Sequence, residues 1–129
     1  MARHKSGFTL IEMLIVVMVI GILTAIAVPK FQQVKGRARA AALRADLRNL
    51  ATAQENYLSQ NHVYANSVGL LTEYTSSEGV TVTIVSGGTG GGWSATTTHP
   101  LSYPLVCAIY HGSVAPLAPA TREGVITCA

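Results

Sequence analysis

A long apolar run near the N-terminus restricts what this chain can fold into. From Phe8 to Val28 there are 21 residues, interrupted only by Thr9, Glu12, Gly21 and Thr24. A helix of that length extends about 30 Å, enough to cross a bilayer once. The run is too apolar for an ordinary water-soluble core, so we expect a membrane-spanning helix and a small globular part of roughly 70 to 100 residues.

A secretory signal peptide is one interpretation of this run. Arg3 and Lys5 supply a basic segment before it, and Ala25-Ile26-Ala27 fits a cleavage site, so a soluble exported domain would be released after Ala27. Glu12 argues against this interpretation. A charge at the centre of an inserted helix costs about 2.5 to 3.5 kcal/mol, and a segment that only directs export has no use for one.

A plain membrane anchor is the second interpretation, and it conflicts with the cysteines. Four cations follow the run, and the positive-inside rule would then place the C-terminal side in the cytoplasm: Lys30, Lys35, Arg37 and Arg39. The two cysteines, Cys107 and Cys128, instead favour an exported domain with one disulfide, because an even count suits an oxidising compartment. Two unpaired buried thiols are the alternative.

The third interpretation gives Glu12 a role in assembly. Cleavage between Gly7 and Phe8 would create an α-amino group one helical turn from the carboxylate. The helix dipole already favours a carboxylate there by about 0.3 to 1 kcal/mol. In an assembly, the Phe8 amine of one subunit could neutralise Glu12 of its neighbour and set the axial register, because an unpaired buried charge is strongly unfavourable.

The residues that carry this interpretation resemble a known family. Lys5-Ser6-Gly7, then Phe8-Thr9-Leu10-Ile11-Glu12 and the apolar run to Pro29, are similar to the type IV prepilins and the related pseudopilins of type II secretion. The resemblance implies that a membrane-bound aspartic peptidase cuts after Gly7 and N-methylates Phe8, and that Glu12 is the assembly carboxylate. It divides the chain into a cytoplasmic leader (1–7), a hydrophobic helix that forms the filament core (8–29) and a globular head (30–129).

The same resemblance implies a fold, a function and a set of partners. The fold would be α+β: a long N-terminal helix, membrane-spanning in its first half and amphipathic in its second, packed on a small antiparallel sheet of about four strands. The function would be that of a structural subunit of a type IV pilus (fimbrium) or related filament, with a type II secretion pseudopilin as the alternative.

The expected partners are further copies of the chain, minor pilins, the prepilin peptidase that is also the N-methyltransferase, and the pilus assembly platform. The resemblance places the prepilin in the inner membrane as a single-pass protein. After assembly it would lie in an extracellular pilus at the cell surface or in a periplasmic pseudopilus.

Beyond the apolar run, we expect the helix to continue to about Gln60. Pro29 lacks a backbone N–H donor, which predicts a kink or a loosened turn in the helix. This flexibility either lets the helix adapt between membrane and filament or is a passive kink. Leucines at helical spacing predict a buried stripe: Leu43, Leu47, Leu50 and Leu58. The cations of this segment have no carboxylate three or four residues away and are either solvated or paired with neighbouring subunits or lipid phosphates: Lys35, Arg37, Arg39, Arg44 and Arg48.

The second half of the chain predicts four strands. Their expected ranges are Val80–Val85, Trp93–Thr98, Leu105–Tyr110 and Gly124–Cys128, with a flexible turn over Gly87–Gly92. Cys107 and Cys128 fall in the last two strands, and similarity to the cysteine-bounded C-terminal region of many type IV pilins adds weight to a disulfide between them. Three aromatic residues are expected to pack on the sheet: Trp93, Tyr103 and Tyr110.

No residue pattern points to catalysis, a metal or a cofactor. The glycine-rich stretch lacks the Gly-Lys-Ser/Thr of a phosphate loop, and Cys107 with His111 lacks a second pair of zinc ligands. Only Glu123 lies beyond Glu78 to supply calcium with a carboxylate. The net charge of +3 falls to +1 without the two N-terminal cations, so it does not predict nucleic-acid binding, and DNA uptake stays open without support. We expect no enzyme.

Overall fold

The structure, a computed structural model, describes Met1 and residues 7–129. Arg3, Lys5, Ser6 and most of the expected leader therefore lie outside the described residues. The chain separates into two compact units, Met1–Lys35 and Gly36–Ala129. A single helix, α1 (Leu10–Asn61), contributes its first part to one unit and its second part to the other.

The first part of α1 is continuous through Pro29. Gly21, the other expected weak point, is also helical. The kink proposed for Pro29 stays a prediction. This part is long and apolar enough to cross a membrane by length and composition.

The second part of α1 is amphipathic, as its leucine spacing predicts. Leu43, Leu47 and Leu50 are fully buried, and Leu58 packs against the same cluster. The helix ends at Asn61, one residue beyond the expected end. His62 follows with a left-handed φ of 61°, and its N–H donates to the Leu58 carbonyl at 2.8 Å, which satisfies an acceptor that the helix end would otherwise leave free.

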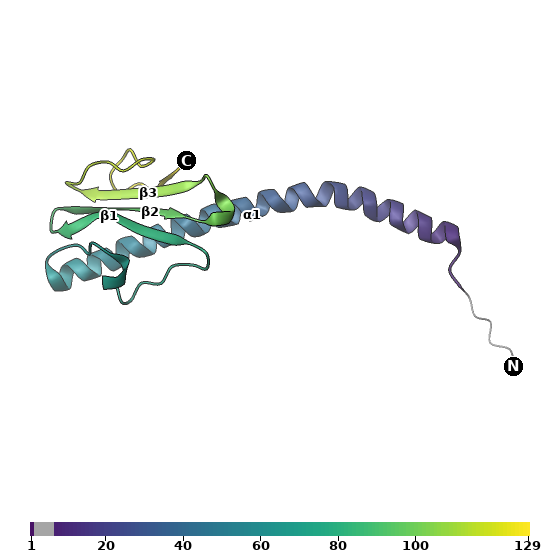
Figure 1. Cartoon of the computed structure of the whole chain (residues 1–129), viewed down its shortest axis with the longest axis horizontal. Helices are drawn as coiled ribbons and strands as arrows, with labels where there is room; N and C mark the ends of the chain where they lie inside the picture. The colour runs from purple at the N-terminus through teal and green to yellow at the C-terminus, as the bar shows by residue number, and fades with distance from the viewer. Residues whose placement is uncertain (2–6) are drawn as a thin grey trace. The chain divides into compact units, whose positions relative to one another are not determined.

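Four strands follow in an antiparallel sheet in which sequence neighbours pair. They are β1 (Thr81–Thr89), β2 (Gly92–Thr98), β3 (Val106–Gly112) and β4 (Thr127–Cys128), in the order β1-β2-β3-β4. Two short 3₁₀ helices lie in the connections, η1 (Val68–Leu70) and η2 (Pro100–Ser102). Figure 1 shows β1, β2 and β3 lying along the second part of α1. The expected α+β architecture is confirmed.

Two strand boundaries differ by three or more residues from those that the sequence predicts. β1 continues through Gly87 and Gly88 to Thr89, because the Gly88 N–H and the Thr89 carbonyl bond to the Tyr64 backbone at 2.9 and 3.0 Å. The chain reverses only after Thr89, and the pairing with β2 is irregular in this glycine-rich part. β4 is limited to Thr127–Cys128, so the expected strand over Gly124–Ile126 was wrong.

The core lies between the leucine stripe of α1 and the sheet. The side chains of Trp93, Ala95, Cys107 and Ile109 meet the stripe there. The expectation for the aromatic residues holds for Trp93, which is buried, but was wrong for Tyr103, which is 87% exposed in the connection between β2 and β3. A side chain beside Pro104 and outside the ladder has no sheet surface to cover it.

Two buried polar side chains of α1 hold the connection between α1 and β1. Gln54 exchanges two hydrogen bonds with the Ala65 backbone, at 3.0 Å to its carbonyl and 2.8 Å from its N–H. Asp46 accepts from the N–H and the hydroxyl of Ser77, at 2.9 and 2.8 Å. Because buried polar groups are costly unless bonded, these pairs fix where the connection lies on the helix.

Candidate functional site

The first part of α1 presents apolar side chains on every side. Its large apolar residues, from Phe8 to Val34, are between 49% and 83% exposed. A helix in water covers one face with polar residues, whereas a helix that is apolar all round needs an apolar surrounding. This surface therefore requires lipid or other apolar helices around it.

The first turn of this helix holds the predicted assembly carboxylate in a capping box. The N–H and the hydroxyl of Thr9 both donate to Glu12 Oε2 at 2.8 Å, and the Glu12 N–H donates to Thr9 Oγ1 at 3.3 Å. Such reciprocal bonds satisfy donors that a helix N-terminus leaves free. Sequence reasoning missed Thr9 as a functional residue, although Thr-x-x-Glu before an apolar run is the pattern of this cap.

Thr24, a polar residue within the apolar run, also forms its side-chain hydrogen bonds within the helix. The Thr24 hydroxyl donates to the carbonyls of Ile20 and Gly21, at 2.9 and 3.0 Å. A hydroxyl bonded in this way exposes no free donor to hydrocarbon. The apolar surface is therefore not broken by an unsatisfied polar group at this position.

The predicted cleavage position lies just before the helix. Gly7 and Phe8 are exposed and precede the first helical residue, Leu10. A Cβ added at Gly7 would meet no described atom within 4 Å, so the packing of the described residues does not require a glycine there.

The two cysteines meet at the edge of the sheet. Cys107 and Cys128 face each other across β3 and β4 and form a disulfide with an S–S distance of 2.02 Å. Since the bridge closes a loop of 21 residues, the chain-entropy relation assigns it about 3 kcal/mol of stabilisation. It holds a strand of only two residues in the sheet.

The arginines of α1 find partners that sequence spacing could not indicate. Arg39 Nη1 donates to the Leu101 carbonyl at 3.2 Å, and Arg44 Nε lies 3.3 Å from the sulfur of Cys128. Among the described residues, none of the α1 arginines forms an ion pair with a carboxylate. Arg44 and Arg48 line a groove beside the C-terminal segment.

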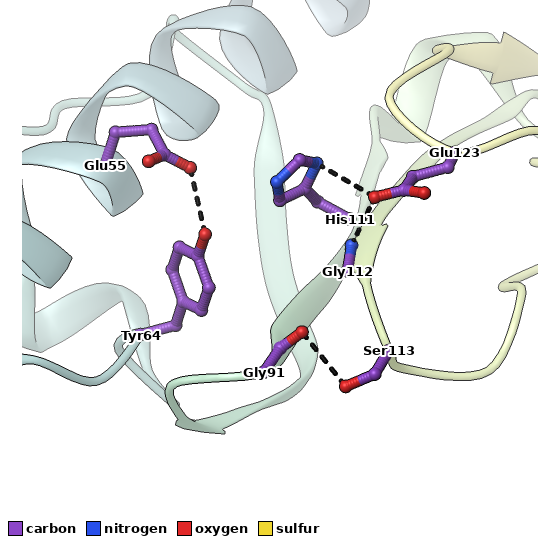
Figure 2. A network of polar contacts seen from close by, with 7 residues as sticks. All are labelled: Glu55, Tyr64, Gly91, His111, Gly112, Ser113 and Glu123. Carbon is purple, nitrogen blue, oxygen red and sulfur yellow. Dashed lines mark hydrogen bonds and ion pairs between the residues drawn. The ribbon is translucent and has the colours of Figure 1, made fainter.

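Polar contacts link five segments at the end of the head that contains the C-terminus of α1. Figure 2 shows the Tyr64 hydroxyl directed at Glu55, and His111 and Gly112 directed at Glu123. The distances are 3.1 Å for Tyr64 to Glu55, 3.4 Å for His111 Nδ1 to Glu123 Oε1, and 2.7 Å for the Gly112 N–H to the same oxygen.

The contacts of this network hold segments of the head together. Burial, together with the hydrogen bond to Glu55, raises the pKa of Tyr64, which keeps its hydroxyl protonated as a donor. Ser113 completes the network through its N–H and hydroxyl, both of which donate to the Gly91 carbonyl. Within the described residues, no three His, Cys, Asp or Glu side chains gather in a way that could hold a metal ion.

The chain matches one family description and several known proteins. Residues 2–28 match the prokaryotic N-terminal methylation motif. The chain is 39% identical over 87 residues to the type IV major pilin protein PilA of Myxococcus xanthus, which is 65% of this chain and 40% of that protein. It is 36% identical over 69 residues to the type IV wide pilus major component PilA4 of Thermus thermophilus, covering 54% of this chain and 53% of that protein.

A third relative comes from a secretion system. The type II secretion system core protein G of Pseudomonas aeruginosa is 35% identical over 65 residues, which is 50% of this chain and 46% of that protein. The chain thus spans about half the length of the curated relatives it matches. The methylation motif and these similarities support a type IV pilin family for this chain, and its matched relatives are structural pilin-type proteins rather than enzymes.

Proposed function

We propose that this chain is a structural subunit of a type IV pilus or a related filament. In this proposal the chain is cut after Gly7, Phe8 is N-methylated, and the first part of α1 leaves the membrane to pack in a filament core. The observation that carries the proposal is a helix apolar on all sides whose carboxylate, Glu12, lies in its first turn.

The exposed position of Gly7 and Phe8 supports processing at this bond, because a peptidase needs an extended, uncovered segment. A new amine at Phe8 would lie one turn from its own Glu12 and, in a filament, could reach Glu12 of a neighbour. Since an unpaired buried charge is costly, registers that leave either charge alone would be disfavoured. The partners would be further copies, minor pilins, the processing peptidase and the assembly platform.

A secretion pseudopilin is the second candidate, favoured by the similarity to a type II secretion core protein. Both candidates share the anchored prepilin and the helical core and differ in where the filament ends, outside the cell or in the periplasm. Immunogold labelling of intact cells separates them, because only an extracellular pilus is labelled without permeabilisation.

The N-terminus of the mature protein tests processing. Mass spectrometry of the purified chain is expected to find methylated Phe8 as its first residue. Val28 at the N-terminus would instead indicate release of a soluble exported domain, and an intact Met1 would indicate a plain anchor. Either of these results overturns the proposal.

Two substitutions at Glu12 test assembly. Glu12→Ala should leave membrane insertion intact and lower filament yield at least about a hundredfold, since an uncompensated buried charge costs about 3 to 5 kcal/mol. Glu12→Gln is the matched control, because its amide oxygen can still accept the bonds from Thr9 but carries no charge. If Glu12→Gln assembles normally, the carboxylate acts only as a helix cap and the pairing with Phe8 is wrong.

A further inference from the structure

The charges of the head balance in number but are separated in space. From Gly36 onward there are five arginines and five carboxylates. Three carboxylates have partners within the head: Asp46 with Ser77, Glu55 with Tyr64, and Glu123 with His111. Among the described residues, the remaining two, Glu73 and Glu78, are exposed and have no side-chain hydrogen bond or ion pair.

Two of the five arginines of the head line one groove. We call it the basic groove; it encloses about 490 Å³ and is lined by Arg44, Arg48, Ala51, Ile109, Gly124, Val125 and Ile126. Arg44 and Arg48 are four residues apart, so they lie on the same side of α1 and reinforce each other's positive potential. The floor of the groove is apolar, which suits the stem of a side chain whose end is charged.

The unpaired carboxylates lie on the other side of the helix. They belong to residues 73–78, which we call the acidic loop. Asp46 fixes this loop through Ser77, and the Tyr74 hydroxyl donates to the Asp46 carbonyl at 3.3 Å. Asp46 is two residues from both arginines, and at 100° per residue it points about 160° away from each of them. Figure 1 agrees, with the C-terminal segment (yellow) and the connection from α1 to β1 (teal) on opposite sides of the second part of α1.

We propose that the basic groove of one copy receives the acidic loop of a second copy. The inference rests on the proposed filament function and names a contact that would accompany the packing of the N-terminal helices. A head with balanced but separated charge offers another copy both halves of the contact, whereas its five arginines and five carboxylates leave no net positive charge to attract nucleic acid or an anionic lipid surface. The two surfaces face apart, so the contact is heterologous and repeats instead of closing into a two-fold dimer.

Charge reversal with rescue tests this contact in the full chain. Arg44→Glu with Arg48→Glu is expected to reduce filament yield at least about tenfold, because juxtaposed like charges disfavour association. Adding Glu73→Arg with Glu78→Arg should restore filaments. The control is Arg122→Glu, which reverses one charge at an exposed arginine outside the groove and should leave the yield unchanged.

If the charge-reversed variants fail to fold, chemical cross-linking still tests the contact. In filaments of the Arg48→Lys variant, a carbodiimide should join the introduced amine to Glu73 or Glu78 of another copy, giving a ladder of linked subunits. Mass spectrometry identifies the joined peptides, and Arg122→Lys serves as the control. Normal filaments from the reversed variant, or links that never reach residues 73–78 of another copy, overturn the inference. Absence of filaments from the unchanged chain would overturn the proposed function and the inference with it.

Discussion

The two parts of α1 satisfy their polar side chains in different ways. In the first part every such bond is local: Thr9 with Glu12, and Thr24 with the carbonyls three and four residues before it. In the second part similar local bonds occur, and further bonds reach far along the chain, from Asp46 to Ser77 and from Arg39 to Leu101, 31 and 62 residues apart. The hydrogen bonds of the first part are therefore made within it, whereas the second part is also bonded to distant segments of the head.

The largest expected difference between the two parts comes from removing one leucine side chain in each. Leu47→Ala, at a fully buried position, should lower the free energy of unfolding of the head by about 2 to 5 kcal/mol, because it removes apolar contacts and leaves a cavity. Leu14→Ala, at an exposed position, should change it by less than about 0.5 kcal/mol. Urea unfolding in detergent micelles, followed by the fluorescence of buried Trp93, measures both. Equal losses would contradict the division of α1.

A smaller effect is expected from the long-range bonds. Asp46→Ala leaves the N–H and hydroxyl of Ser77 without their acceptor and should lower the free energy of unfolding by about 1 to 3 kcal/mol. Glu78→Ala is the control, since its exposed carboxylate has no bond within the described head. The same unfolding measurement applies, and identical values for the two variants would show that Asp46 does not hold the acidic loop.

The smallest expected effect is a loss of stability of the head at high pH. Burial, with the nearby charge of Asp46, raises the pKa of Tyr74 from 10.0 to about 12. Because the folded value is the higher one, the stabilisation is fully present below pH about 10 and is lost as the pH rises toward 12.

The first unit described here contains no tyrosine, so this loss should be confined to the head. Tyr74→Phe should show a shallower fall in stability over that range, and absorbance at 295 nm follows the ionisation directly. An unchanged pH profile in Tyr74→Phe would mean that Tyr74 does not contribute.

Much of this fold was readable from local patterns. The leucine spacing from Leu43 onward predicts both the end of α1 and its buried face, since helix periodicity depends only on nearby residues. The alternation over Val80–Val85 likewise predicts the start of β1. The pairing of Cys107 with Cys128 was expected from cysteine parity and from the resemblance to pilins, and the disulfide is present.

The parts that could not be predicted depend on partners distant in sequence. Gly87 and Gly88 have the composition of a turn, but backbone bonds to Tyr64 keep them in β1. Asp46 looks like an ordinary exposed helix acid until Ser77 is placed beside it. At the N-terminus, the roles of Gly7, Phe8 and Glu12 in processing and assembly come from resemblance and stay proposals.

The disulfide between Cys107 and Cys128 affects how freely the connection between β3 and β4 can vary in sequence and length. Residues 113–126 run outside regular structure between β3 and β4, and the bridge from Cys107 to Cys128 holds the strand to which they return. Because closure entropy grows only with the logarithm of length, doubling this loop would cost about 0.6 kcal/mol. Insertions here could alter the outer chemistry of the head while its core and its helix stay the same, so this is where related sequences are free to diverge.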